Sequence, residues 1–116
     1  MTTWRATTEI ALSWPGVEES TWYRTPALKV AGKGFARLRT ESDDKLMVVC
    51  SLAEKEALLA ADDPAFSTTE HYDGHGSILV DLDLVDPAQL RELLVEAWRI
   101  KAPRKLLDGP DPTAST

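Results

Sequence analysis

The sequence has a single cysteine, two histidines and no long apolar run. One cysteine excludes an internal disulfide and favours the reducing cytoplasm as the compartment. No apolar stretch approaches the roughly 18 residues that a membrane-spanning helix needs. No basic segment followed by an apolar one marks the chain for secretion. We therefore expect a cytoplasmic protein that does not bind a membrane.

Catalytic motifs are also lacking: there is no phosphate loop, nucleophile elbow or recognisable carboxylate pair. The only spacing typical of a metal site is the run HYDGH, from His71 to His75. On an extended strand His71, Asp73 and His75 would share a face and suit zinc or iron. The glycines in and after this run favour instead a turn that points them apart. Cys50 ends an apolar run, where a buried, inert cysteine is the common case. The sequence thus predicts a protein that is not an enzyme and binds no metal or cofactor.

The chain has 116 residues, enough for one hydrophobic core and too few for two. We assign residues 1–107 to a single domain. The remaining segment, DGPDPTAST, is rich in Pro, Asp, Ser and Thr and predicts a disordered tail over residues 108–116.

The segment that organises the chain is residues 24–50, where three runs of alternating apolar and polar residues are separated by turn signals. This pattern predicts an antiparallel meander with one face buried. Because side chains alternate along a strand, the first hairpin needs a loop with an odd number of residues, and residues 31–33 provide one. The inward set is then Leu28, Val30, Ala36 and Leu38.

The same requirement for an odd number of loop residues sets the register of the second hairpin, around a polar five-residue loop at residues 40–44. It pairs Arg39 with Lys45, Leu38 with Leu46, and Ala36 with Val48. The other face then mixes cations with apolar groups, namely Lys29, Phe35, Arg37, Arg39, Lys45, Met47 and Val49.

The flanking segments predict helices and further strands. We expect a first helix at residues 4–13, capped by Thr2 or Thr3, and a second at residues 51–61, opened by a Ser51–Glu54 capping box. We expect a third helix at residues 87–101, followed by a short turn at residues 104–107. We expect further extended segments at residues 17–23, 66–72 and 78–84. The order is helix, strands, helix, strands, helix. This predicts a two-layer α+β domain, an antiparallel sheet with helices packed on one face.

The formal net charge is −6, although proteins that bind nucleic acid through phosphates are usually basic. The charges are unevenly placed, however. Residues 24–39 hold five cations and no acid, and residues 99–105 hold four cations and no acid. A local basic surface on an acidic protein is therefore expected.

Several motifs together resemble the MmcQ/YjbR family over nearly the whole chain, up to about residue 107. They are LSWPGVEE at 12–19, TPALKV at 25–30, GKGFARL at 32–38, ALLAAD at 57–62 and the strand GSILVDL at 76–82. The resemblance implies a compact α+β fold like those of type III secretion chaperones and the CyaY-like group. It also implies DNA binding, through a double-wing arrangement, and it supplies no catalytic residues.

Our first hypothesis is therefore a non-enzymatic protein that binds DNA through the basic face of the meander. Cations there would neutralise phosphates, and an aromatic ring would stack on a base. The candidate residues are Lys29, Lys33, Phe35, Arg37, Arg39, Arg104 and Lys105. One alternative is that the strand residues form an ordinary solvated face. The other concerns Arg104 and Lys105, which together with Arg99 and Lys101 are cations of the kind favoured at a helix C-terminus.

The second hypothesis is a chaperone-like protein-interaction module. In it the mixed face with Phe35, Met47 and Val49 receives a partner peptide or a second copy. In either case we expect a monomer, with a weak dimer as the alternative.

Overall fold

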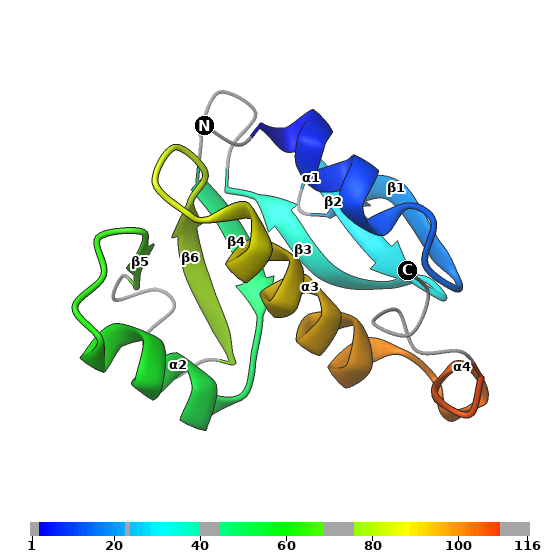
Figure 1. Cartoon of the computed structure of the whole chain (residues 1–116). Coiled ribbons are helices and arrows are strands. Elements are labelled where there is room, and N and C mark those ends of the chain that lie inside the picture. Colours follow the sequence, from blue (N-terminus) through cyan, green and yellow to red (C-terminus); the bar gives the residue numbers. More distant parts are fainter. Residues whose placement is uncertain (1–2, 23, 40–44, 69–75, 110–116) are drawn as a thin grey trace.

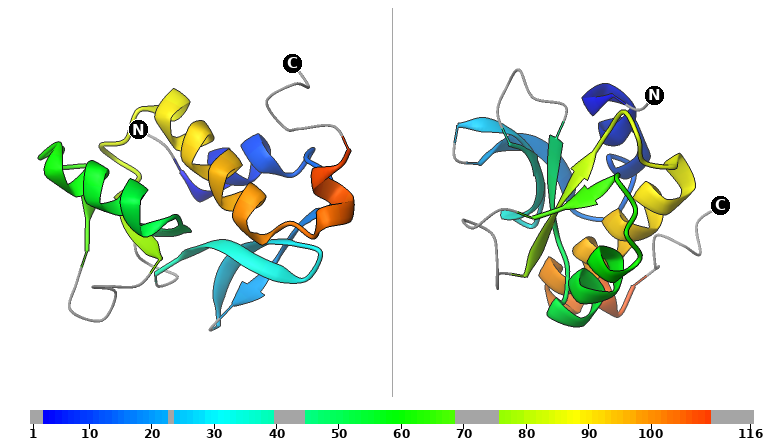
Figure 2. Two further views of the ribbon diagram at one scale, coloured as in Figure 1. Left: turned by 90° about the horizontal axis from the view of Figure 1, so that it is seen from below. Right: turned by 90° about the vertical axis from the view of Figure 1, so that its left-hand side faces the viewer.

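A computed structural model describes residues 3–22, 24–39, 45–68 and 76–109. Helices lie on one side of an antiparallel sheet (Figures 1 and 2), which confirms the predicted α+β class. The elements are α1 (Trp4–Ala11), β1 (Val17–Trp22), β2 (Thr25–Val30), β3 (Lys33–Leu38), β4 (Lys45–Val49), α2 (Leu52–Ala60), β5 (Phe66–Ser67), β6 (Ser77–Asp81), α3 (Pro87–Lys101) and α4 (Arg104–Leu107). The strand order is β1-β2-β3-β4-β6-β5, so the meander continues into β6.

The β3–β4 hairpin has the predicted register. Ala36 lies opposite Val48 and Leu38 opposite Leu46, and the Arg39 amide donates to the Lys45 carbonyl. Residues 40–44, predicted as its loop, lie outside the described residues.

The β2–β3 hairpin differs from the prediction. Its turn has two residues, Ala31 and Gly32, both with positive φ (49° and 82°), rather than the three expected. A two-residue turn with positive φ at both positions suits the right-handed twist of a hairpin. A register shift then leaves Phe35 opposite no residue of β2 and places Leu28 opposite Ala36, the pairing that a loop at residues 31–33 would also give. This extra residue is a β-bulge, and it changes which way the side chains of β3 point.

The helices follow their predicted caps closely. Thr3 caps α1, and Ser51 caps α2 by accepting from the Glu54 amide. Asp86 caps α3, with Pro87 at its first position. The sequence spaces the apolar residues of α3 three and four apart, which predicts one buried stripe on a helix laid across a sheet, and the structure buries that stripe. It comprises Leu90, Leu93, Leu94, Ala97 and Trp98, together with Val95.

Three parts of the prediction are corrected in the second half of the chain. In α2, Leu52 was expected on the apolar side of the helix but is exposed, and Lys55 is the buried residue. The strand expected to reach residue 84 ends at Asp81, because the chain turns there and leaves Leu84 exposed. The strand expected at 66–72 is described only as Phe66–Ser67, and residues 69–75 lie outside the described part.

Both faces of the central strands are buried. The main core lies between the sheet and the helices and includes Phe35 and Trp98. On the opposite face Ala27, Met47 and Leu79 are also at most 5% exposed. Among the described residues, no helix is long and apolar enough to cross a membrane.

Candidate nucleic-acid interface

Phe35 does not have the role predicted for it. The ring is fully buried in the core cluster that also contains Trp98 and Leu90. The cause is the bulge: Phe35 is the extra residue of β3, and Gly34 takes the place opposite Lys29. A ring without accessible surface cannot stack on a base, so this assignment is corrected.

Arg37 is also withdrawn from the surface, with only 8% of its area exposed. Its Nη1 donates to Thr25 Oγ1 at 3.3 Å and to the Leu38 and Arg39 carbonyls at 3.2 and 3.4 Å. A buried cation needs such partners to offset its lost hydration. Arg37 therefore holds β2 and β3 together, and it is not available to a phosphate.

Two further cations of the predicted face are only partly accessible. Lys29 is half-buried and lies opposite Glu18 of β1, so a carboxylate accompanies it on the sheet. Arg39 is half-buried and directly follows β3. Neither presents an isolated positive charge to solvent.

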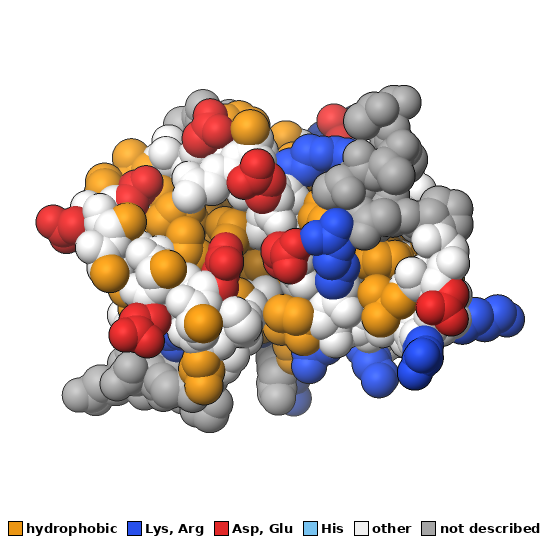
Figure 3. All heavy atoms as spheres, turned by 60° about the horizontal axis from the view of Figure 1, so that its bottom comes forward, with side chains coloured by type: hydrophobic (Ala, Val, Ile, Leu, Met, Phe, Trp, Pro, Cys, Tyr) orange, Lys and Arg blue, Asp and Glu red, His pale blue; other side chains and the backbone are white. Residues whose placement is uncertain are grey.

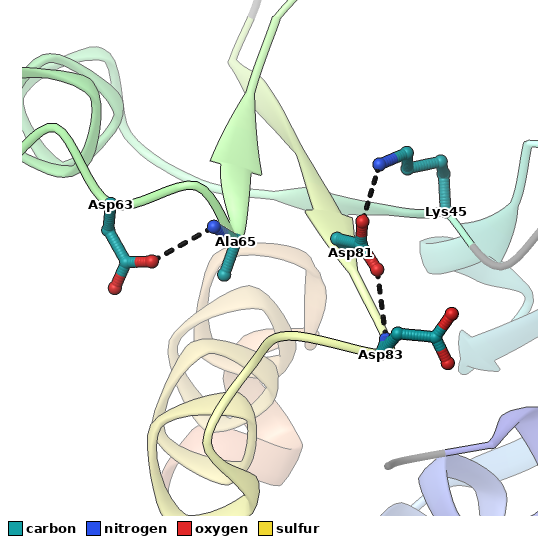
Figure 4. Close-up of polar contacts among 5 residues, drawn as sticks. All are labelled: Lys45, Asp63, Ala65, Asp81 and Asp83. Atoms are coloured by element: carbon teal, nitrogen blue, oxygen red, sulfur yellow. Dashed lines mark hydrogen bonds and ion pairs between the residues drawn. The ribbon is translucent and has the colours of Figure 1, made fainter.

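Lys45 is engaged at the other end of the sheet. Its Nζ donates to Asp81 Oδ2 at 2.7 Å, while Asp81 Oδ1 accepts from the Asp83 amide at 2.9 Å (Figure 4). The Lys45 hydrogen bond is the largest cause that lowers the pKa of Asp81 below its ordinary value of 3.8, although partial burial opposes it. Beside this pair Asp63 accepts from the Ala65 amide at 2.9 Å, which shapes the turn into β5 (Figure 4). These carboxylates and Lys45 are structural.

Lys33, Arg104 and Lys105 are the predicted cations that are exposed. The fold brings them to one end of the molecule although about 70 residues separate Lys33 from Arg104. The contact is made at Gly16, where a Cβ would lie 2.6 Å from Leu106 Cδ1 and 3.5 Å from Val30 Cγ2. We call this group of three exposed cations the basic end.

Gly16 is required at this junction. Its φ of +73° lies in the left-handed region that favours glycine, and its carbonyl accepts from the Ala31 amide at 3.0 Å. The turn before β1, the β2–β3 turn and α4 therefore meet around one residue. Sequence reasoning raised the possibility that α4 extends the basic meander, and the packing of Leu106 places it there.

The motif WPGVEE, which contains Gly16, has an architectural role throughout. Trp98 Nε1 donates to the Pro15 carbonyl at 3.0 Å, and the Arg91 guanidinium lies over the buried Trp14 ring at 5.6 Å from its centre. Trp4 Nε1 donates to Glu19 Oε2 at 3.1 Å. The most recognisable stretch of the sequence thus ties α1, β1 and α3 together rather than forming a reactive site.

Charges of opposite sign are unevenly spread over the surface. Figure 3 shows acidic side chains mainly over α2 and the beginning of α3, and Lys and Arg side chains mainly toward α4, where an acidic side chain is also visible. Asp108, the exposed C-cap of α4, is an acid at that end. Such separation allows a protein of net charge −6 to carry a local positive potential.

Metal and thiol chemistry find no support in the described part of the chain. No group of three His, Cys, Asp or Glu residues within it could hold a metal ion. The HYDGH run, His71 to His75, lies outside the described residues. Cys50 is buried, and burial is the main cause that raises the pKa of its thiol, which disfavours the reactive thiolate.

Comparison with known proteins gives a consistent family and fold. The model of the YjbR family matches residues 12–100. Uncharacterized proteins Rv2570 of Mycobacterium tuberculosis and Mb2600 of Mycobacterium bovis are 40% identical over 55 residues, a match that covers 47% of this chain and 43% of theirs. The chain thus matches less than half the length of these relatives. The crystal structure of Deinococcus radiodurans protein DR2400, with a DUF419 domain, has a TM-score of 0.76 at 24% identity and covers 96% of this chain and 91% of that one.

Proposed function

This chain belongs to the YjbR family, and we propose that it is a non-enzymatic protein that binds nucleic acid through the basic end. The observation that carries the proposal is the packing of Leu106 against Gly16 beside Val30. It gathers exposed cations from two distant segments, Lys33 on one side and Arg104 and Lys105 on the other. Positive charges grouped in this way attract a polyanion even when the protein as a whole is acidic.

The chemistry of the basic end favours contacts to phosphates rather than to bases. Lysine and arginine side chains that reach phosphates position a protein on the duplex but carry no sequence information. With Phe35 buried, the aromatic ring proposed for stacking is absent from this surface. We therefore expect binding that depends weakly on sequence.

The alternative function, a protein-interaction module, loses the surface proposed for it. Phe35, Met47 and Val49 are each at most 8% exposed, so they do not form an apolar docking face. The exposed large apolar residues within the described segments are Leu12, Leu52, Leu84, Ile100 and Leu107, which come from separate elements. Single exposed apolar residues are normal on a protein surface.

The test is fluorescence anisotropy of labelled duplex DNA titrated at several salt concentrations. Three phosphate contacts predict a slope of log K against log salt of about −3, since each contact to B-DNA contributes about −0.9. The double variant Lys33→Gln/Lys105→Gln should reduce the slope to about −1.

The matched control is Arg5→Glu, which changes the net charge by the same amount as the double variant. Arg5 is exposed on α1 and pairs only loosely with Glu9, at 3.5 Å with both side chains mostly exposed, so the fold should be unaffected. It should retain the slope of the unmodified protein. Equal effects of the two variants would show that only net charge matters, and no binding at low salt would refute the proposal.

A further inference from the structure

Helix α4 is joined to the rest of the domain by a single side chain. None of its four residues is fully buried, and in the described part of the chain its backbone hydrogen bonds stay within residues 103–109. Of these four residues only Leu106 packs against the core, where its Cδ1 lies over Gly16 beside the fully buried Val30. Figures 1 and 2 show α4 as a separate turn beyond the end of α3. The position of α4 therefore depends on one contact.

The segment that leads into α4 does not hold it in place. Helix α3 ends at Ala102, which is extended with φ −66° and ψ 139°, and Pro103 follows with φ −68° and ψ 155°. These two extended residues interrupt the helical hydrogen bonds, and proline has no amide proton to continue them. Pro103 also caps α4 without a side-chain hydrogen bond. A rotation at this junction moves α4 as a unit and leaves α3 intact.

The free-energy balance at the Leu106 contact is small. A half-buried leucine recovers only part of the hydrophobic stabilisation of a fully buried one, and ordering a few backbone residues costs conformational entropy of similar size. A helix of one turn is not stable without packing. The basic end also gathers three like charges, which repel one another until a polyanion neutralises them. Such a contact opens locally, without unfolding of the domain.

We propose that α4 is a latch: it exchanges between a docked position, with Leu106 on Gly16, and a detached one, and a bound polyanion holds it docked. The inference rests on the proposed function, because the polyanion is the nucleic acid bound at the basic end. In the docked form all three cations face the same stretch of phosphates, whereas in the detached form Lys33 is left alone. Because nucleic acid binds the docked form more tightly, binding shifts the population toward that form.

The first test is hydrogen exchange of individual amides, measured by NMR. The amides of residues 106–109 are hydrogen-bonded to carbonyls of residues 103–106, so they report whether α4 is formed. In the free protein they should be protected about tenfold, as expected for one half-buried leucine, whereas amides in the middle of α3 should exchange only through unfolding of the domain. Saturating duplex DNA should raise the protection of residues 106–109. Equal protection of α4 and α3 in the free protein, or no rise with DNA, would overturn the proposal.

The second test removes the latch without changing the charge. Leu106→Ala removes the side chain that reaches Gly16, and Leu107→Ala is the matched control, since it makes the same substitution at the exposed neighbour. Between about 50 and 200 mM salt, the unmodified protein and Leu107→Ala should lose about 40-fold in affinity for duplex DNA, as expected for three phosphate contacts. Leu106→Ala should lose only about fourfold, as expected for Lys33 alone.

The two tests separate the latch from the proposed function. If the unmodified protein does not bind DNA, the proposed function fails and the coupling fails with it, while hydrogen exchange of the free protein still shows whether α4 detaches. If the protein binds DNA but Leu106→Ala and Leu107→Ala have the same affinity and salt dependence, the cations of α4 act without docking, and the latch is refuted. Both substituted residues lie outside the buried core, so both variants should fold, which far-ultraviolet circular dichroism checks.

Discussion

The junction at Gly16 allows a quantitative prediction, because three glycines of this chain separate the two costs of adding a methyl group. At Gly16 both apply: φ is +73° and a Cβ would lie 2.6 Å from Leu106 Cδ1. At Gly32 only the backbone cost applies, since φ is +82° and nothing lies within 4 Å. At Gly34 only the steric cost applies, with Trp22 Cε3 at 2.4 Å.

The magnitudes follow from these contacts. Holding alanine in the left-handed region costs about 1 kcal/mol, so Gly32→Ala should lower the melting temperature by about 4 °C. Gly16→Ala adds displacement of Leu106, for a total of about 2 kcal/mol and about 8 °C. Gly34→Ala must move a tryptophan ring and should cost about 1–3 kcal/mol without any backbone strain.

The assay is thermal and urea unfolding of the three variants followed by circular dichroism. A double-mutant cycle with Leu106→Ala isolates the close contact at Gly16, because the methyl group then meets only the Val30 side chain, at an ordinary van der Waals distance of 3.5 Å. Gly16→Ala and Leu106→Ala together should destabilise the protein by less than the sum of the single changes. If Gly16→Ala lowers the free energy of unfolding no more than Gly32→Ala does, α4 does not pack on this turn. The contact that defines the basic end would then be refuted.

Two further changes test the contacts that hold the fold. The depressed pKa of Asp81 means that its ionised form stabilises the folded state above the unfolded pKa, and this contribution is lost as the pH falls through the folded value. Asp81→Asn should therefore lower the urea midpoint at neutral pH. The difference in urea midpoint between the variant and the unmodified protein should shrink below about pH 4. A difference that stays constant with pH would contradict the role of Lys45. Trp98→Phe removes the donor to the Pro15 carbonyl and should cost about 1–3 kcal/mol, whereas an unchanged urea midpoint would show that this hydrogen bond contributes nothing.

Local chemistry accounts for the elements that were predicted correctly. Helix α3 begins and ends as expected because Asp86 caps it, Pro87 suits its first turn and its apolar stripe has helical spacing. The β3–β4 register followed from the alternation of apolar residues, since a slip of one residue would expose the whole set. The family resemblance rests on motifs that are similarly local.

The candidate site was predicted only in part. The sequence determined which residues carry positive charge and that they cluster along the chain, and it indicated the strands and the C-terminal turn on which they lie. It did not determine which of them reach solvent. The bulge in β3 turned Phe35 into the core, and the neighbours of Arg37 removed that cation from the surface.

The location of the basic end was decided by tertiary packing alone. Leu106 meets Gly16 and Val30 across the domain, and no periodicity within either segment encodes that meeting. The physical reason is that secondary structure depends on neighbours a few residues apart, which a pattern records. Side-chain exposure and charge clustering depend on which segments fold against each other.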